Sequence, residues 1–267
     1  MASRARITDF LRAASLALLL GAPCTASAQP ANMPPLEITD AVIGRPGSNA
    51  LAELFPLATP GRHPAVIVLH TCGGVARMTR DWARRLNDWG YVALMVDSFR
   101  PRKVDSVCDN GLRIPPGLRA RDAYAAASWL AAQDFVDPAH IAAIGFSHGG
   151  STALALALPR FQRPGDVKIV ATIGYYPGCR FQVPPNMPVL ILIGEKDDWT
   201  PAQDCRDYVA QFPGADISMT VYPGIRHSFD VNAPTRNFAG HWLEYDSEAA
   251  ADSFKRTREF LAQYLGK

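Results

Sequence analysis

The architecture of this chain can be worked out from one short segment, Gly145-Phe146-Ser147-His148-Gly149. It follows the apolar run Ile141 to Ile144, which is typical of a buried strand, and it precedes a small, apolar helical segment at 150–158. A strand that turns at once into a helix crowds its own backbone, and the two glycines remove the side chains that would collide there. The pattern predicts that Ser147 lies on a strained turn, with its hydroxyl raised as a nucleophile above the carboxyl edge of a sheet.

Strand-like and helix-like segments alternate along the rest of the chain. An antiparallel opening pair is expected at 36–43 and 50–57, and later strands at 65–70, 91–96, 141–144, 169–175, 189–193 and 217–222. Helices are expected at 78–89, 118–132, 150–158, 202–211 and 247–265. Strands separated by helices form a mainly parallel, doubly wound sheet flanked by helices. The fold class is therefore predicted to be α/β, with the α/β-hydrolase architecture.

A serine nucleophile needs a base, and this architecture supplies one in a fixed order. An acid and then a histidine should follow the serine along the chain, each just past a strand. Asp197 follows the predicted strand 189–193, and His227 follows the predicted strand 217–222. We expect His227 to take the proton of Ser147 and Asp197 to orient the imidazole.

Two of these assignments have alternatives. An aspartate after a strand is often only a turn former or a helix cap, and Asp198 stands directly beside Asp197. His241 lies in the long stretch after His227. Asp198 and His241 therefore remain second candidates for the acid and the base.

The negative charge of a tetrahedral intermediate also has to be stabilised. Two backbone N–H groups are expected to do this, one from the residue after the nucleophile and one from the loop after the strand 65–70. The first belongs to His148. The loop reads His70-Thr71-Cys72-Gly73-Gly74, whose glycines let the main chain approach a ligand closely. The N–H of Cys72 is the expected second donor, and that of Thr71 is the next choice.

Residues 1–28 have the pattern of a secretory signal peptide. Three arginines precede the apolar run 13–20, and Ala26-Ser27-Ala28 supplies the small residues that a signal peptidase requires. The apolar run is too short for a permanent membrane-spanning helix, which leaves a membrane anchor as the alternative. We expect residues 29–267 to form a single catalytic domain that is secreted or periplasmic.

Composition and charge exclude some classes of protein. With 48% hydrophobic and 19% charged residues, the 267-residue chain can bury one sizeable core. The formal net charge is +2, and because residues 1–28 hold three arginines and one aspartate, the remainder is neutral. A neutral domain lacks the basic footprint of a nucleic-acid-binding protein. The composition does not predict the oligomeric state.

Four cysteines remain after the predicted cleavage: Cys72, Cys108, Cys179 and Cys205. An even number of cysteines in an oxidising compartment is typical of disulfides, and four thiols allow three complete pairings. One or two disulfides are expected, and four buried free thiols are the alternative. Since no C-x-x-C spacing occurs, neither a metal site nor a redox cofactor is predicted.

Several motifs in this order resemble the dienelactone hydrolase family of α/β hydrolases. They are 69-LHTCGG-74, 91-YVALMVDSF-99, 145-GFSHGG-150, 176-YPG-178, the segment around Asp197, and 222-YPG-224 with His227. The resemblance covers residues 36–265. It implies a small-molecule ester or lactone as substrate and an acyl-enzyme on Ser147, without a cofactor.

The chain departs from the type enzymes of that family at two positions. They use cysteine in the elbow, whereas this chain has Ser147, whose hydroxyl needs full activation by a base. They also carry a glutamate where this chain has Thr71. The arginines that could bind a substrate carboxylate are Arg100, Arg102, Arg113 and Arg180. Because of the two departures, the expected reaction is general ester or lactone hydrolysis.

Rival interpretations use the same fold. A thioesterase or a peptidase would need the same three side chains and differ only in its pocket. An exported binding protein on a hydrolase scaffold would leave the serine unused.

Overall fold

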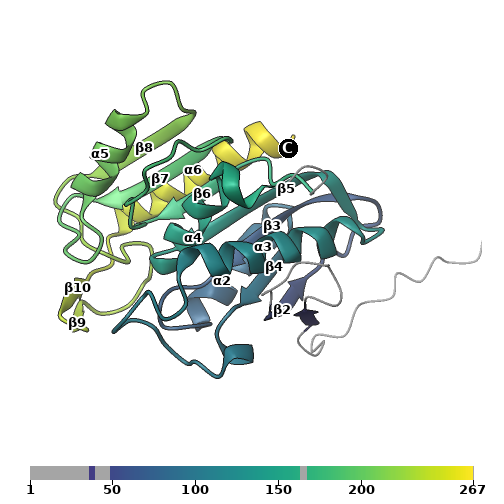
Figure 1. Ribbon diagram of the computed structural model, residues 1–267, viewed down its shortest axis with the longest axis horizontal. Coiled ribbons are helices and arrows are strands. Elements are labelled where there is room, and N and C mark those ends of the chain that lie inside the picture. Colours follow the sequence, from purple (N-terminus) through teal and green to yellow (C-terminus); the bar gives the residue numbers. More distant parts are fainter. Residues whose placement is uncertain (1–35, 40–48, 163–166, 267) are drawn as a thin grey trace, which may run out of the picture.

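A computed structural model describes residues 36–39, 49–162 and 167–266 of the chain. The predicted signal peptide, residues 1–28, lies outside the described residues. The main sheet has eight strands in the order β1-β2-β4-β3-β5-β6-β7-β8 (Figure 1). Its strands are β1 (Leu36–Thr39), β2 (Asn49–Phe55), β3 (His63–Leu69), β4 (Val92–Asp97), β5 (Val136–Phe146), β6 (Thr172–Tyr175), β7 (Val189–Gly194) and β8 (Ile217–Tyr222). The first two strands are antiparallel to their neighbours and the other pairs are parallel.

Helices cover both faces of this sheet. They are α2 (Arg77–Asp88), α3 (Pro116–Ala131), α4 (His148–Leu156), α5 (Ala202–Gln211) and α6 (Ser247–Leu265), with two 3-10 turns, η1 (Arg100–Arg102) and η2 (Pro159–Phe161). Helices α3 and α4 contact each other and lie in front of the sheet in Figure 1. On the other face α2 packs on α6, where the rings of Trp82 and Phe254 lie 5.2 Å apart. The predicted α/β fold is confirmed.

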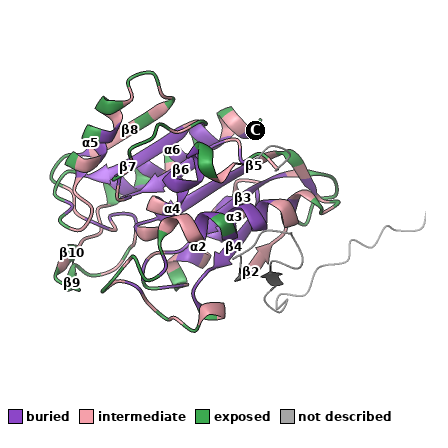
Figure 2. Ribbon diagram, in the orientation of Figure 1, coloured by how far each residue is buried: buried purple, intermediate pink, exposed green. Residues whose placement is uncertain are grey.

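The strands are apolar because they are covered on both faces. All six residues of β4 and of β7 are buried, and Figure 2 shows the buried residues concentrated in the sheet. Strands of this kind read as continuous apolar runs rather than as alternating ones. Each parallel strand ends at the same edge of the sheet, so the loops after β3, β5, β7 and β8 meet there.

The predicted element bounds are mostly close to the observed ones. The helices predicted at 202–211 and 247–265 are confirmed at both ends. Strand β6 is shorter than predicted: Val170 and Ala171 each form one backbone hydrogen bond with β5, and the ladder begins at Thr172. Strand β5 is longer, since Val136 pairs with His63 across a bulge. Strand β1 ends at Thr39, and residues 40–43 lie outside the described residues.

The sequence did not predict a second, two-stranded sheet. Strands β9 (Arg236–Phe238) and β10 (His241–Leu243) form a hairpin between β8 and α6. Each strand has only three residues, too few for a recognisable alternation of apolar and polar side chains. The hairpin lies at the edge of the main sheet where β7 and β8 end, and Leu243 of β10 forms a bridge with His227 in the loop after β8 (Figure 1).

Both disulfides are present, so the alternative of four free thiols is wrong. Cys72 pairs with Cys108, and Cys179 pairs with Cys205. The first ties the loop after β3 to the long loop before α3, and the second ties the loop after β6 to α5. Both disulfides therefore fix loops at the edge of the sheet where the predicted site residues lie.

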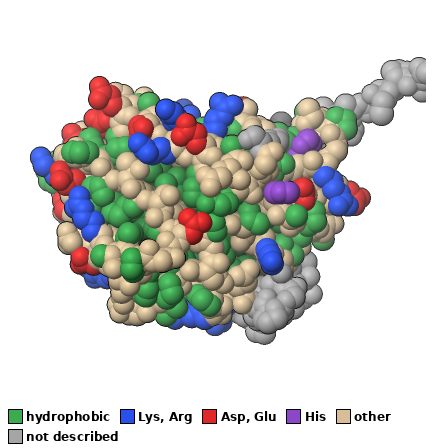
Figure 3. All heavy atoms as spheres, turned by 90° about the horizontal axis from the view of Figure 1, so that it is seen from above, with side chains coloured by type: hydrophobic (Ala, Val, Ile, Leu, Met, Phe, Trp, Pro, Cys, Tyr) green, Lys and Arg blue, Asp and Glu red, His purple; other side chains and the backbone are tan. Residues whose placement is uncertain are grey.

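Charges of both signs are mixed on the surface. On the face shown in Figure 3, Lys and Arg side chains and Asp and Glu side chains both occur among the described residues, with much apolar and uncharged surface between them. In that described part of the chain, no helix has the length and apolar character needed to cross a membrane.

Candidate active site

Ser147 occupies the turn between β5 and α4. Its φ of +55° and ψ of −116° place it in a backbone region that side-chain-bearing residues rarely adopt, which is the strained turn that the sequence predicts. A Cβ on Gly145 would overlap the carbonyl group of Gly149, and a Cβ on Gly149 would overlap the carbonyl oxygen of Leu69. The two glycines therefore allow α4 to start directly against the sheet.

His227 and Asp197 lie next to this serine. The Nε2 atom of His227 is 3.0 Å from Ser147 Oγ, and its Nδ1 atom is 2.7 Å from Asp197 Oδ2. An ionised carboxylate can only accept, so Nδ1 carries the proton and the Nε2 lone pair faces the hydroxyl. The imidazole is 1% exposed and lies between the rings of Tyr176 and Trp199. The fold thus joins three side chains from different loops in one hydrogen-bond chain.

The structure distinguishes Asp197 from Asp198. Asp197 Oδ1 accepts hydrogen bonds from the backbone N–H groups of Trp199 and Thr200, each at 2.9 Å. Its Oδ2 accepts from the imidazole and, at 3.0 Å, from the Thr200 hydroxyl. Asp198 instead accepts from the N–H of Trp242 at 3.3 Å. Its carboxylate lies 3.5 Å from Nδ1 of His241, the other second candidate. Both second candidates therefore lie against each other, outside the Ser147–His227 pair.

Two backbone N–H groups lie free near the serine. His148 is the first residue of α4, where N–H groups have no partner within the helix. Among the described residues, the N–H groups of His148 and Cys72 donate to no protein acceptor. Cys72 is held by its disulfide and by a 2.8 Å hydrogen bond from the N–H of Val107 to its carbonyl. These are the two donors that the sequence predicts for an oxyanion.

Both ring nitrogens of His148 form hydrogen bonds. Arg119 Nη1 lies 2.7 Å from Nδ1, and a guanidinium can only donate, so Nδ1 is the acceptor. The proton is then on Nε2, which donates to the carbonyl of Gly111 at 2.9 Å. Burial, and next the charge of Arg119, lower the pKa of His148 to about 3. The ring is therefore neutral and cannot serve as an acid or base at neutral pH.

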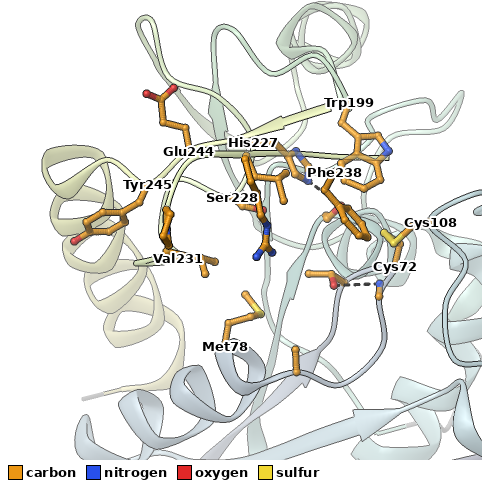
Figure 4. A pocket seen from close by; sticks show the side chains of 18 residues that line it. Cys72, Met78, Cys108, Trp199, His227, Ser228, Val231, Phe238, Glu244 and Tyr245 are labelled. Carbon is orange, nitrogen blue, oxygen red and sulfur yellow. Dashed lines mark hydrogen bonds between the residues drawn. A yellow bond between two sulfur atoms is a disulfide. The ribbon is translucent and has the colours of Figure 1, made fainter. Parts of the chain in front are cut away.

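Two cavities meet at Ser147. Cys72, Cys108, Ser147 and Trp199 line both of them. The first has a volume of about 200 Å³ and is mainly apolar. Its walls include Met78, Val231, Ala233, Pro234, Phe238 and Leu243. Figure 4 shows Trp199 and Phe238 on the side of the disulfide, with Val231 and Tyr245 on the opposite side.

The second cavity is more polar, and its walls include His148, Thr200, Arg180 and Asp204. The site thus offers a mainly apolar space and a second space with more polar side chains in its walls. Among the described residues, no cluster of His, Cys, Asp or Glu has a geometry that could hold a metal ion.

The arginines expected to face the site are mostly engaged elsewhere. Arg102 forms a bidentate pair with buried Asp122. Arg113 pairs with Asp109 on the surface. Arg100 pairs with Asp97 and lines a separate cavity that does not reach Ser147. These three candidates pair with carboxylates of the chain itself and do not line the two cavities at Ser147.

Arg180 lines the second cavity, where it pairs with Asp204 at 2.8 Å. Arg236, which the sequence analysis did not single out, lines the apolar cavity instead. It comes from β9 of the hairpin. Because the hairpin was not predicted, residue 236 could not be placed near residue 147 from the sequence.

The hairpin is connected to the loops that carry the acid and the base. His227 forms a β-bridge with Leu243, and the N–H of Glu244 donates to the His227 carbonyl at 3.1 Å. The ring of His241 stacks on Trp199 with centroids 4.7 Å apart. His241 therefore packs against Trp199, which lines both cavities, and takes no part in the hydrogen-bond chain of Ser147.

The family model of the dienelactone hydrolases matches residues 54–265. The chain is 26% identical over 210 residues to a Bradyrhizobium protein named "Probable 2-oxo-3-(5-oxofuran-2-ylidene)propanoate lactonase", with 70% of this chain and 82% of that protein covered. The residues matched by the family model include Ser147, Asp197 and His227.

Solved structures show the same fold. A dienelactone hydrolase-like promiscuous phosphotriesterase from metagenomic libraries superposes with a TM-score of 0.70 and 24% identity, covering 86% of this chain and 97% of that one. A thermophilic esterase from Thermogutta terrifontis superposes with a TM-score of 0.63 and 17% identity, covering 87% and 95%. Because the family model spans most of its length, this chain belongs to the dienelactone hydrolase family and is a hydrolase with the α/β-hydrolase fold.

Proposed function

We propose that this hydrolase cleaves ester or lactone bonds of small molecules through an acyl-enzyme on Ser147. The observation that carries the proposal is the continuous hydrogen-bond chain from Ser147 Oγ through His227 to Asp197. A nucleophile, a base within hydrogen-bond reach and a group that orients the base are the parts that acyl transfer requires.

The reaction follows from this arrangement. His227 Nε2 takes the proton of Ser147 as Oγ attacks the carbonyl carbon, and the N–H groups of His148 and Cys72 stabilise the oxyanion. The carbon–oxygen bond to the leaving group then breaks, and the imidazolium gives its proton to the departing oxygen. Water attacks the acyl-enzyme with His227 again as base, and Ser147 regains its proton as the acid leaves. Asp197 stabilises the imidazolium throughout.

The two cavities support a small substrate that spans Ser147. The apolar space fits an alkyl or aromatic group of limited size, whereas the second space, with Thr200 and Arg180, fits a more polar group. In a lactone, the acyl part and the alcohol part of the ester belong to one ring. The name of the Bradyrhizobium relative, a lactonase, and the esterase among the structural neighbours support this class of substrate.

A panel of substrates tests the proposed class. Esters and lactones of graded size would be compared with matched thioesters and peptide anilides, with and without a p-nitrophenyl alkylphosphonate. We expect turnover of small esters and lactones, its loss after phosphonate treatment, and one phosphonyl group per chain by mass spectrometry. Faster turnover of thioesters or anilides would favour the rival enzymes. Phosphonate-resistant chains without turnover would favour the binding protein.

We also propose that residues 1–28 direct export of the enzyme and are then removed as a signal peptide. The arginine-rich start, the short apolar run and Ala26-Ser27-Ala28 support this, and two disulfides suit an oxidising compartment. Expression in a Gram-negative host, followed by fractionation and intact-mass analysis, tests it. The expected product is periplasmic or secreted and starts at Gln29. A full-length protein retained in the cytoplasm would contradict export.

The Cys72–Cys108 disulfide is expected to support catalysis as well as stability. Replacing both cysteines with alanine frees the loop that offers the Cys72 N–H, and misplacing one oxyanion donor should lower kcat by about 100-fold. Steady-state kinetics, normalised to sites titrated with the phosphonate, measures this effect.

The Cys179–Cys205 disulfide provides a matched control. The two bridges enclose 36 and 26 residues, so removing either should cost a similar free energy of unfolding, about 3–4 kcal/mol. The Cys179→Ala/Cys205→Ala variant should lose thermal stability but keep kcat within about threefold, because neither cysteine offers an oxyanion donor. Equal kcat losses in the two double variants would show that the first bridge has no special role.

A further inference from the structure

Arg119 is a buried arginine that the steps above do not use. It lies on α3, is 0% exposed, and is the largest of the fully buried side chains. Burying a guanidinium is unfavourable unless its charge and donors are compensated. Among the described residues, however, no carboxylate lies within ion-pair distance of Arg119. Its guanidinium instead donates to Nδ1 of His148 at 2.7 Å and to the carbonyl of His70 at 2.8 Å.

These two acceptors belong to the two segments that offer oxyanion donors. His148 supplies one N–H directly. His70 influences the orientation of the other N–H, that of Cys72, because Nδ1 of His70 donates to the carbonyl of Thr71 at 2.7 Å. That carbonyl and the N–H of Cys72 belong to the same peptide group, and in a planar trans peptide they point in opposite directions. Fixing the Thr71 carbonyl toward the interior therefore turns the Cys72 N–H the other way.

The same arginine also sets the charge of this region. Burial lowers the pKa of Arg119 to about 9, so the guanidinium stays protonated at neutral pH. His70 and His148 both have pKa values lowered by burial and by this charge, so both rings are neutral. The only positive charge bonded to the two donor segments is thus on Arg119, among the residues that the structure describes.

We propose that Arg119 is a positioning residue of the oxyanion hole, which holds the Thr71–Cys72 peptide and His148 so that both N–H groups face the developing negative charge. This inference rests on the proposed function, because an oxyanion forms only if Ser147 attacks a carbonyl. An oxyanion hole accelerates acyl transfer only when its donors are fixed before the reaction. One guanidinium with two hydrogen bonds provides that fixation from behind the site.

The test is Arg119→Met, which keeps the length and apolar stem of the side chain but removes its donors and charge. With p-nitrophenyl acetate, and per site titrated with the phosphonate, we expect kcat to fall about 100-fold while KM changes by less than about threefold. An alkylboronic acid, which forms a tetrahedral anionic adduct with a serine, should bind more weakly by a similar factor. If Arg119 only stabilised the fold, neither kcat nor boronate affinity per titrated site would change.

Arg102→Met is the matched control. It also removes a guanidinium that bonds to α3, through Asp122, but it contacts neither oxyanion segment. This variant should unfold at a lower temperature because buried Asp122 loses its bidentate partner, yet it should keep kcat and boronate affinity per titrated site.

Two milder variants keep the inference testable if Arg119→Met does not fold. Arg119→Lys retains the charge but cannot reach both acceptors in the same fork, and His148→Ala retains the backbone N–H but loses the contact. Each should lower kcat by about 10-fold, and the double variant should lose less than the product of the two, since both changes break one contact. Unchanged kcat in both single variants would overturn the role of Arg119. Unchanged turnover in Ser147→Ala would instead refute the proposed function itself.

Discussion

Ser147→Ala is expected to lower kcat for p-nitrophenyl acetate by about six orders of magnitude, to the level left by binding and the oxyanion donors alone. Without Oγ no acyl-enzyme can form, and His227 loses the hydroxyl that lies 3.0 Å from its Nε2. The KM should change little, because alanine fits within the space of serine and the walls of both cavities stay in place. Steady-state kinetics and intact-mass analysis after phosphonate treatment measure both parts of this expectation.

Ser128→Ala serves as the control for removing a hydroxyl elsewhere. Ser128 lies on α3, where its hydroxyl only donates to the Tyr124 carbonyl one turn earlier. This variant should keep full turnover and still take up one phosphonyl group. If Ser147→Ala were labelled and turned over like the unaltered enzyme, another nucleophile would be responsible and the acyl-enzyme on residue 147 would be ruled out.

The elbow could be predicted from the sequence because its requirements are local. Gly145 and Gly149 are needed where the backbones of β5, α4 and the end of β3 approach one another, and no other residue type fits. The order of nucleophile, acid and base is likewise tied to the ends of strands. The apolar runs fix those ends, and so Ser147, Asp197 and His227 could all be named before any coordinates were known.

Contacts between distant segments could not be predicted in the same way. Four cysteines permit three pairings, and the distance between thiols depends on how loops of 36 and 26 residues fold. The β9–β10 hairpin has strands too short to show a period, so Arg236 and Phe238 were not expected at the site. Their positions follow from tertiary contacts, such as the bridge between His227 and Leu243, that leave no trace in local composition.

Arg119 shows a further limit of sequence reasoning. Arginine is among the residues that are most often exposed, so composition places it on the outside of α3. The helix around it is rich in alanine and buried on several sides, and it gives no clear apolar stripe from which an inward position could be read. Only the structure shows that residue 119 points to His70 and His148.

Asp197→Asn is expected to lower kcat/KM by about 10⁴-fold with little change in fold. The N–H groups of Trp199 and Thr200 both donate to Oδ1, so the amide oxygen of asparagine will occupy that position. Its NH₂ group must then face Nδ1 of His227, which forces Nδ1 to accept and leaves the proton on Nε2. In that tautomer the imidazole cannot take the proton of Ser147.

Asp198→Asn is the matched control, since it makes the same chemical change one residue away. Asp198 accepts from the N–H of Trp242 and lies near His241, so its amide should keep the first contact and leave His227 untouched. We expect less than a threefold effect on kcat/KM, on the order of a surface substitution. The opposite ranking of the two variants would assign the acid to residue 198. Since both changes remove one negative charge from the same loop, a difference of several orders of magnitude would trace to the direct contact of Asp197 with the imidazole.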